Sequence, residues 1–220
     1  MDKAQLSKNY QGVLNTVKNY DGARLLLATK MQSCEDINYL VSKGAYLIGE
    51  NKVNELLEKY EGYDKRAEIH FIGTLQSNKV KYIIDKVSLI HSVDKLSLLE
   101  EIDKRAKKIG KVMDVLIEVN SGKEENKGGV FPEDVSDFYE KAKAFESVRV
   151  RGLMTMAPRC QSREEYLKYF GLTKKLFDEL FSSDENAILS MGMSESYEYA
   201  LEAGATLVRV GSKIFGERKY

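Results

Sequence analysis

A lysine that follows a short apolar run is the residue of this chain best suited to covalent chemistry. The run is Arg24-Leu-Leu-Leu-Ala-Thr-Lys30, and it predicts a buried strand with an amine at its end. Partial burial favours the neutral, nucleophilic form of a lysine amine, and that form condenses with carbonyl groups. The alternative is an ordinary solvated lysine, the commoner role among the 34 Lys and Arg residues of the chain.

Small polar residues near the C-terminus form a second group with chemical potential. Ser194 precedes a predicted helix over residues 195–203, so we expect its side chain to cap that helix. A serine hydroxyl and the backbone N–H groups of a helix start together can bind a phosphate. Gly211 and Ser212 offer a second turn rich in donors after another apolar run. For each of these turns, a purely structural role is the alternative.

Arg209 and Asn51 are further candidates beside apolar runs. Arg209 stands inside such a run, and a buried guanidinium needs a partner, which is either a structural salt bridge or a ligand. Asn51 follows an apolar run at the start of a predicted helix, so capping is its simplest role. His70 lies between two apolar residues and is expected to be a hydrogen-bonded core residue.

The elements that position these residues alternate regularly along the chain. An amphipathic helix over residues 3–20 comes first. The predicted strands cover residues 25–30, 46–50, 69–73, 88–93, 112–119, 148–154, 187–191 and 206–210. Predicted helices between them cover residues 35–43, 53–60, 77–85, 95–108, 132–145, 163–181 and 195–203. Short strands that are apolar on both faces are typical of a parallel sheet covered by helices.

Eight strand–helix units in a chain of this length predict an α/β fold, a single (β/α)8 TIM barrel with an extra N-terminal helix. The runner-up is an open doubly wound sheet, but no Gly-x-Gly-x-x-Gly turn follows the first strand. We expect one domain over residues 1–220, because no change in composition divides the chain. A barrel places its functional residues at the C-terminal ends of the strands, often with phosphate after the last two strands.

The composition limits the possible partners. The 34 basic and 34 acidic residues give a formal charge of zero, which argues against nucleic acid as the main partner. Cys34 and Cys160 form no disulfide framework, as expected in a reducing compartment. We see neither a signal-peptide core nor an apolar stretch of membrane-spanning length, so we expect a cytoplasmic protein without a membrane partner. His70 and His91 lack the spacing of metal ligands. A monomer is expected, and a dimer is left open.

Several motifs, in order along the chain, resemble those of the YggS/PROSC family of pyridoxal phosphate homeostasis proteins. They are Ile48-Gly-Glu-Asn51 with Glu55-Leu-Leu57, His70-Phe-Ile-Gly73 with Leu75-Gln-Ser-Asn-Lys79, Gly152-Leu-Met-Thr-Met156, Leu189-Ser-Met-Gly-Met-Ser194, and Val208-Arg-Val-Gly211 with Ile214-Phe-Gly216. The family often has Ser, Trp and Thr where this chain has Thr29, Ile69 and Ser212. The first and last of these differences keep a hydroxyl group.

The resemblance implies a fold-type III barrel related to the N-terminal domain of alanine racemase, with pyridoxal 5'-phosphate held as an aldimine on Lys30. It also implies phosphate contacts in two turns, a cation facing the pyridine nitrogen and an amide beside the ring. The matching residues are Lys30, Asn51, Ser194, Arg209, Gly211 and Ser212. An arginine opposite the pyridine nitrogen disfavours protonation of that nitrogen, so the ring becomes a weaker electron sink.

Two functions follow from the resemblance, and a third from the pattern of elements alone. The first is a binding protein for vitamin B6 homeostasis, which holds the cofactor reversibly and has no robust turnover. The second is an amino-acid racemase, which needs proton transfer on both faces of a carbanion. Lys30 could serve one face, but only His70 and Tyr197 suggest themselves for the other. Few residues follow the eighth predicted strand, whereas such racemases need a second domain. The third is a sugar-phosphate enzyme without pyridoxal phosphate.

Overall fold

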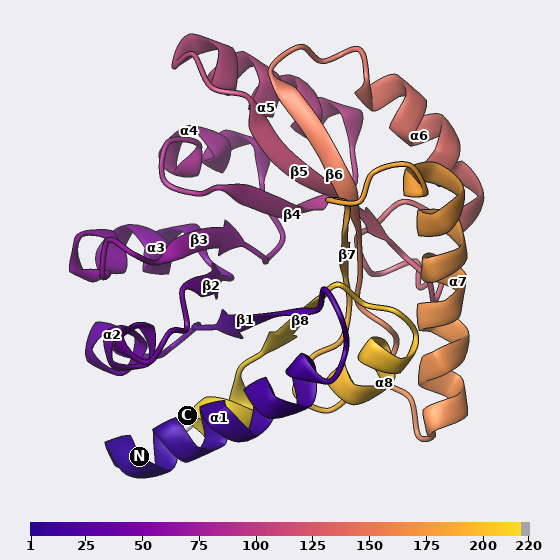
Figure 1. Cartoon of the computed structure of the whole chain (residues 1–220). Coiled ribbons are helices and arrows are strands. Elements are labelled where there is room, and N and C mark those ends of the chain that lie inside the picture. Colours follow the sequence, from indigo (N-terminus) through magenta and orange to yellow (C-terminus); the bar gives the residue numbers. More distant parts are fainter. Residues whose placement is uncertain (217–220) are drawn as a thin grey trace.

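Eight parallel strands close into a barrel in the computed structural model, which describes residues 1–216 (Figure 1). The strands are β1 (Arg24–Ala28), β2 (Leu47–Glu50), β3 (Glu68–Phe71), β4 (Leu89–Val93), β5 (Met113–Val119), β6 (Val148–Thr155), β7 (Ile188–Ser190) and β8 (Leu207–Val210). Each strand pairs with the next along the chain, and β8 pairs with β1 to close the ring. The predicted (β/α)8 barrel is therefore confirmed.

Helices form the outer layer of the barrel. They are α1 (Lys3–Lys18), α2 (Cys34–Ser42), α3 (Val53–Lys59), α4 (Val80–Ile83), α5 (Leu96–Lys108), α6 (Val135–Ala142), α7 (Arg163–Phe181), α8 (Tyr197–Glu202) and α9 (Ser212–Phe215). Local capping fixes where some of them begin. The side chain of Ser33 accepts a hydrogen bond from the backbone of Asp36 at the start of α2, and Ser162 does the same at the start of α7.

Alternation along the strands divides the apolar side chains between the two faces of the barrel wall. Successive side chains of a strand point to opposite faces, so Leu26 and Leu27 belong to different clusters. Leu27 joins the large core between strands and helices, whereas Leu26 packs with Leu47, Ile72 and Leu207 in a small separate cluster. The strands also carry several buried polar residues, including His70, His91, Ser190 and Arg209.

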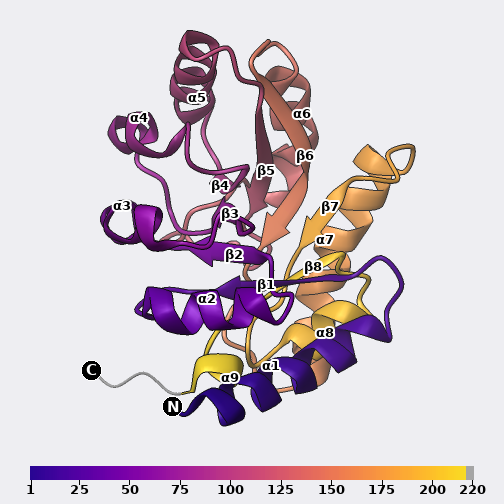
Figure 2. The same cartoon turned by 60° about the vertical axis from the view of Figure 1, so that its left-hand side comes forward.

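The extra helix α1 packs against the outside of the barrel, alongside α8 and α9 (Figures 1 and 2). Its buried side chains are Leu6, Tyr10, Val13 and Val17, which recur at helical spacing and form one apolar stripe. The side-chain amide of Asn9 donates a hydrogen bond to the carbonyl oxygen of Ile214 in α9 at 3.0 Å. The first and the last described helices are therefore joined directly.

The structure shifts several predicted boundaries. The helix predicted over residues 77–85 is a 3-10 turn (η2, Ser77–Lys79) followed by the short α4. The helix predicted over residues 132–145 is likewise a 3-10 turn (η3, Pro132–Asp134) followed by α6. A further 3-10 turn (η1, Tyr60–Gly62) follows α3. The first strand ends at Ala28, so Lys30 lies in the turn after β1.

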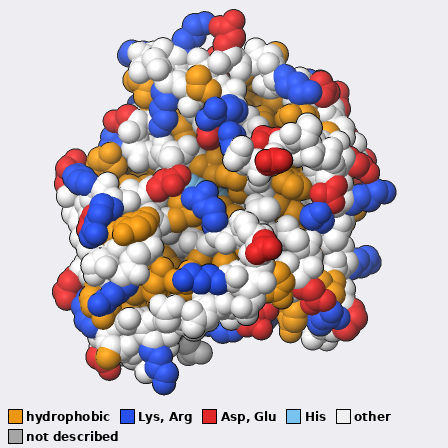
Figure 3. All heavy atoms as spheres, viewed as in Figure 1, with side chains coloured by type: hydrophobic (Ala, Val, Ile, Leu, Met, Phe, Trp, Pro, Cys, Tyr) orange, Lys and Arg blue, Asp and Glu red, His pale blue; other side chains and the backbone are white. Residues whose placement is uncertain are grey.

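None of the helices within residues 1–216 is long and apolar enough to cross a membrane. On the face seen in Figure 3, basic and acidic side chains are interspersed, in keeping with the formal charge of zero. The prediction of one domain over residues 1–220 includes residues 217–220, which lie outside the described residues, and it stays a prediction.

Candidate functional site

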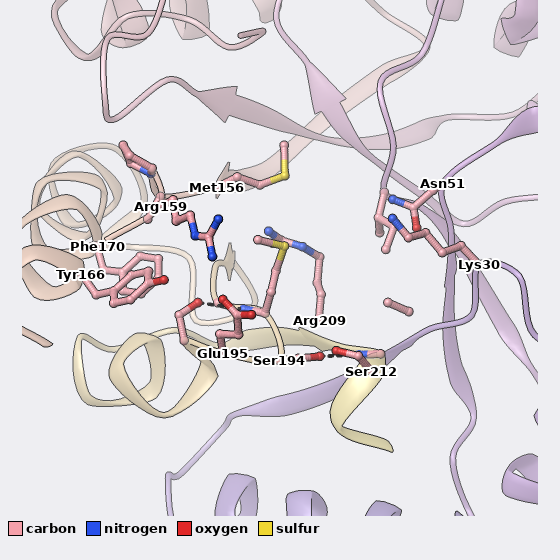
Figure 4. Close-up of a pocket in the computed structure, with 18 of the residues that line it drawn as sticks. Lys30, Asn51, Met156, Arg159, Tyr166, Phe170, Ser194, Glu195, Arg209 and Ser212 are labelled. Atoms are coloured by element: carbon pink, nitrogen blue, oxygen red, sulfur yellow. Dashed lines mark hydrogen bonds between the residues drawn. The ribbon is translucent and has the colours of Figure 1, made fainter. Parts of the chain in front are cut away.

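A cavity of about 590 Å³ opens at the C-terminal ends of the strands. All six residues singled out from the sequence line it: Lys30, Asn51, Ser194, Arg209, Gly211 and Ser212. Figure 4 shows Lys30 and Asn51 on one side of the cavity, Met156 and Tyr166 on the opposite side, and Arg209 between them. The barrel therefore brings into one cavity residues that are separated by up to 182 positions (212 − 30) in the sequence.

The backbone before Lys30 is held by side chains from β2 and α3. The hydroxyl of Thr29 donates to Oε1 of Glu50 at 2.8 Å, and Nζ of Lys59 donates to the carbonyl oxygen of Thr29 at 3.1 Å. Tyr63 donates to the same Glu50 oxygen at 2.6 Å. Burial, reinforced by the Glu50 carboxylate, raises the pKa of the Tyr63 phenol, which therefore remains a donor.

The backbone after Lys30 is held by the same group of side chains. The N–H of Met31 donates to Glu55, which also pairs with Lys59. Met31 has a φ of 62°, an uncommon conformation for a residue with a side chain. We call Glu50, Glu55, Lys59 and Tyr63 the Lys30 clamp, because they fix the peptide groups on both sides of that lysine. This clamp was not predicted from the sequence, although Glu50 at the end of the apolar strand β2 was a signal.

The two turns expected to bind phosphate are bonded to each other. The hydroxyl oxygen of Ser194 accepts hydrogen bonds from the backbone N–H of Gly211 at 3.2 Å and of Lys213 at 3.3 Å. The expectation that Ser194 caps a helix over residues 195–203 is wrong, because α8 begins only at Tyr197. The backbone donors of the last turn therefore converge on Ser194 at the cavity wall.

Gly192 allows the chain after β7 to pack closely against α8. Its φ is +87°, and an added Cβ would lie 2.5 Å from Cβ of Ala200 and 2.9 Å from Cα of Tyr197. A side chain at this position would therefore push the Ser194 turn away from α8.

Asn51 presents a buried polar atom at the cavity. The expected cap is wrong: the residue before α3 is Lys52, and no side chain caps that helix. Oδ1 of Asn51 is buried and has no hydrogen-bond partner among the described residues. Leaving a buried acceptor without a donor costs about 1–3 kcal/mol, so a donor supplied by a ligand would be favourable there.

Arg209 carries a buried positive charge into the cavity. Its side chain is 4% exposed, and it donates to the hydroxyl of Ser190 at 2.6 Å and to the carbonyl oxygen of Thr155 at 3.1 Å. Burial lowers the pKa of the guanidinium to about 10, so the group remains charged at neutral pH. Within residues 1–216 no ion pair joins Arg209 to a carboxylate, and its described partners are neutral oxygen atoms.

Glu118 is a buried acid that the sequence analysis did not single out. It lines a smaller cavity of about 290 Å³, which shares Met156 and Lys127 with the larger one. Burial, together with the nearby charge of Asp94, raises the pKa of the Glu118 carboxyl to about 7. Its neighbour in the sequence, Val119, is apolar. Because successive side chains of a strand point to opposite faces, the alternation along β5 was a signal that Glu118 faces inward.

The chemistry of this donor set fits a phosphate ester that carries an aldehyde. Lys30 offers an amine, and Ser194 with the adjoining N–H groups offers a place for an anion. Arg209 adds a fixed cation, and Asn51 adds a buried acceptor. These features define a barrel that binds a carbonyl-bearing, anionic ligand through a lysine.

The model of the family described as alanine racemase, N-terminal domain, matches residues 1–219. The protein is 49% identical to the pyridoxal phosphate homeostasis protein of Aquifex aeolicus over 201 residues, which are 90% of this chain and 88% of that protein. The chain therefore belongs to the alanine racemase N-terminal domain family and, within it, to the pyridoxal phosphate homeostasis proteins. The resemblance stated from the sequence motifs is confirmed.

Solved structures support the same grouping. An unknown protein from Bifidobacterium adolescentis superposes with a TM-score of 0.91 at 30% identity, covering 98% of this chain and 97% of that chain. PipY of Synechococcus elongatus, solved with pyridoxal phosphate bound, superposes with a TM-score of 0.83 at 26% identity, covering 96% of this chain and 100% of that chain.

Proposed function

We propose that this protein binds pyridoxal 5'-phosphate reversibly and takes part in its homeostasis. The observation that carries the proposal is that Lys30, Arg209 and the Ser194 turn line one cavity. The relatives that bear the name pyridoxal phosphate homeostasis protein support it, as does the pyridoxal phosphate bound to PipY.

Each residue in the cavity has a distinct part in this proposal. When bound, pyridoxal phosphate supplies an aldehyde that condenses reversibly with an amine. Lys30 would supply that amine, and the Lys30 clamp would keep its backbone in place. Ser194, Gly211 and Ser212 would hold the phosphate group, Arg209 would face the pyridine ring, and Asn51 would lie beside it.

Borohydride reduction of the cofactor-loaded protein, followed by peptide mass mapping, tests the covalent attachment. We expect a pyridoxyl group on the peptide that contains Lys30 and none after Lys30→Ala. Lys52→Ala, which removes an exposed lysine nearby, is the control and should keep the adduct. An adduct on another lysine, or none on a loaded sample, would contradict the proposal.

The proposal includes the absence of robust turnover. A racemase would need a second proton-transfer group beside the ligand. Neither His70 nor Tyr197 is among the residues that line the cavity, so neither suits that role. Alanine racemisation by the loaded protein should not exceed that of free cofactor under the same conditions, and a higher rate would favour the racemase alternative.

We further propose that the protein acts in the cytoplasm as a monomer and without nucleic acid. Cys34 and Cys160 are unpaired in the structure, which suits a reducing compartment. The interspersed charges give no one-signed surface on the face in view. Light scattering of the loaded protein tests the monomer: a mass near 25.0 kDa is expected, and twice that mass would indicate a dimer.

A further inference from the structure

A continuous row of hydrogen bonds leads from the start of β3 to the cavity. The distances are 3.0 Å from Glu68 Oε1 to His70 Nε2, 2.9 Å from His70 Nδ1 to His91 Nε2, 3.1 Å from His91 Nδ1 to Ser190 Oγ, and 2.6 Å from Ser190 Oγ to Arg209 Nη1. We call these five residues the interior row. Glu68 is half exposed, whereas the other four side chains are buried.

The two ends of the interior row fix the direction of its hydrogen bonds. A guanidinium only donates and an ionised carboxylate only accepts. The hydrogen bond from His70 lowers the pKa of Glu68 to about 2, so this carboxylate is ionised at neutral pH. His70 therefore donates to Glu68 through Nε2. Burial lowers the pKa of His70, so the ring is neutral and its Nδ1 must accept.

The same reasoning sets the remaining protons. His91 donates through Nε2 to His70, so its Nδ1 accepts. Ser190 receives an N–H from Arg209 and directs its own proton to His91 Nδ1. Both imidazoles are then neutral with the proton on Nε2. Burial lowers the pKa of both histidines, which agrees with neutral rings.

We propose that the interior row positions Arg209, with Ser190 as its direct holder and the two histidines as the support of Ser190. The inference rests on the proposed function, in which Arg209 faces the cofactor ring. A neutral acceptor holds the guanidinium without cancelling its charge, as an adjacent carboxylate would. Glu68 lies three hydrogen bonds beyond Ser190 and pairs with Arg24, whereas the carboxylate whose charge acts on Arg209 is Glu118, which forms no ion pair with it among the described residues. The row therefore holds the guanidinium through neutral groups and leaves it facing the cavity.

Nitrogen-15 NMR of the ligand-free protein tests the row without reference to the cofactor. We expect neutral rings protonated at Nε2 for His70 and His91 at pH 7. Ser190→Ala should increase the mobility of the Arg209 Nε–H group on the nanosecond scale. A charged ring, an Nδ1 proton on His91, or an equally rigid Arg209 in the variant would overturn the proposal, whether or not the protein binds pyridoxal phosphate.

Cofactor binding provides the second readout. Ser190→Ala should weaken pyridoxal phosphate binding about tenfold, since one hydrogen bond to a charged group is lost, while the adduct on Lys30 persists. Glu68→Gln provides a variant at the partly exposed end, in which an amide can donate or accept. We expect mixed tautomers of His70 in it. Asp64→Asn, another carboxylate outside the row, is the control and should leave tautomers and affinity unchanged. Wild-type affinity in Ser190→Ala would contradict the positioning role.

Discussion

Nζ of Lys59 lies 3.1 Å from the carbonyl oxygen of Thr29, the residue immediately before Lys30. This contact joins α3 to the turn after β1. Because the same ammonium also pairs with Glu50 and Glu55, it balances one buried and one partly buried carboxylate beside the lysine that carries the proposed chemistry. The side chain of Lys59 is 14% exposed and that of Glu50 is fully buried.

Lys59→Met should therefore cost much more stability than a surface substitution. Removing one member of a buried ion pair leaves an uncompensated charge and costs about 3–5 kcal/mol. We expect a loss of this size in urea unfolding, and slower formation of the Lys30 adduct in the fraction that remains folded. Lys65→Met, which breaks the exposed pair with Glu61, should cost less than about 1 kcal/mol. Equal losses in the two variants would refute the clamp.

Glu118 should make the protein less stable as the pH rises. Its folded-state pKa of about 7 exceeds the ordinary value of 4.5, so the folded state binds more protons between these limits. The free energy of unfolding therefore falls from about pH 4.5 to pH 7. Glu118→Gln should raise stability above pH 7 by up to about 3 kcal/mol and match the wild type near pH 4. Urea titrations across this pH range measure the difference, and an offset independent of pH would argue against burial of the charged acid.

Gly192 and Gly171 provide a matched pair of glycine substitutions. Gly192→Ala would place its Cβ against Ala200 and Tyr197 at a positive φ, so we expect a loss of about 1–3 kcal/mol and weaker ligand binding. Gly171 lies within α7 with open space around it, and Gly171→Ala should stabilise the protein by about 0.5–1 kcal/mol. Thermal and urea unfolding distinguish the two, and opposite signs are the expected result.

Ser194→Ala should weaken retention of the phosphate group without unfolding the protein. The substitution removes the acceptor that gathers the N–H groups of Gly211 and Lys213, and it removes a hydroxyl donor from the cavity. We expect the dissociation constant of pyridoxal phosphate to rise about fivefold to tenfold. Binding of pyridoxal, which lacks the phosphate, is the control and should change little. An equal effect on both ligands would argue against a phosphate role.

The eight strands and the set of cavity residues were predictable from the sequence for one physical reason. Parallel strands bring their C-terminal ends to the same edge, so polar residues after apolar runs gather there. Lys30, which follows β1, and Ser212, which follows β8, could be identified in this way although the two strands lie at opposite ends of the sequence. The start of the helix after Ser194 could not be predicted, because its N-cap residue is Ser196 and no side chain caps it.

The supporting contacts were not predictable, because they depend on side chains brought together only by closure of the barrel. His91 and Ser190 are 99 positions apart, and nothing in the local sequence around either indicates the other. The roles of Glu50 and Asn51 were obscured for a similar reason. Both stand at the end of an apolar run, where a helix cap or a solvated side chain is the usual role. Only the tertiary structure shows that Glu50 has buried partners and that Oδ1 of Asn51 has none among the described residues.

The side chain of Asn9 binds the carbonyl of Ile214, two residues beyond Ser212. This bond links a helix at the beginning of the chain to the turn expected to hold phosphate, although no residue of α1 lines the cavity. A ligand that steadies the turn would also protect the helix from transient opening. Amide hydrogen exchange in α1 should then slow when the cavity is filled. Helix α1, which lies outside the barrel, would therefore report whether the ligand is bound.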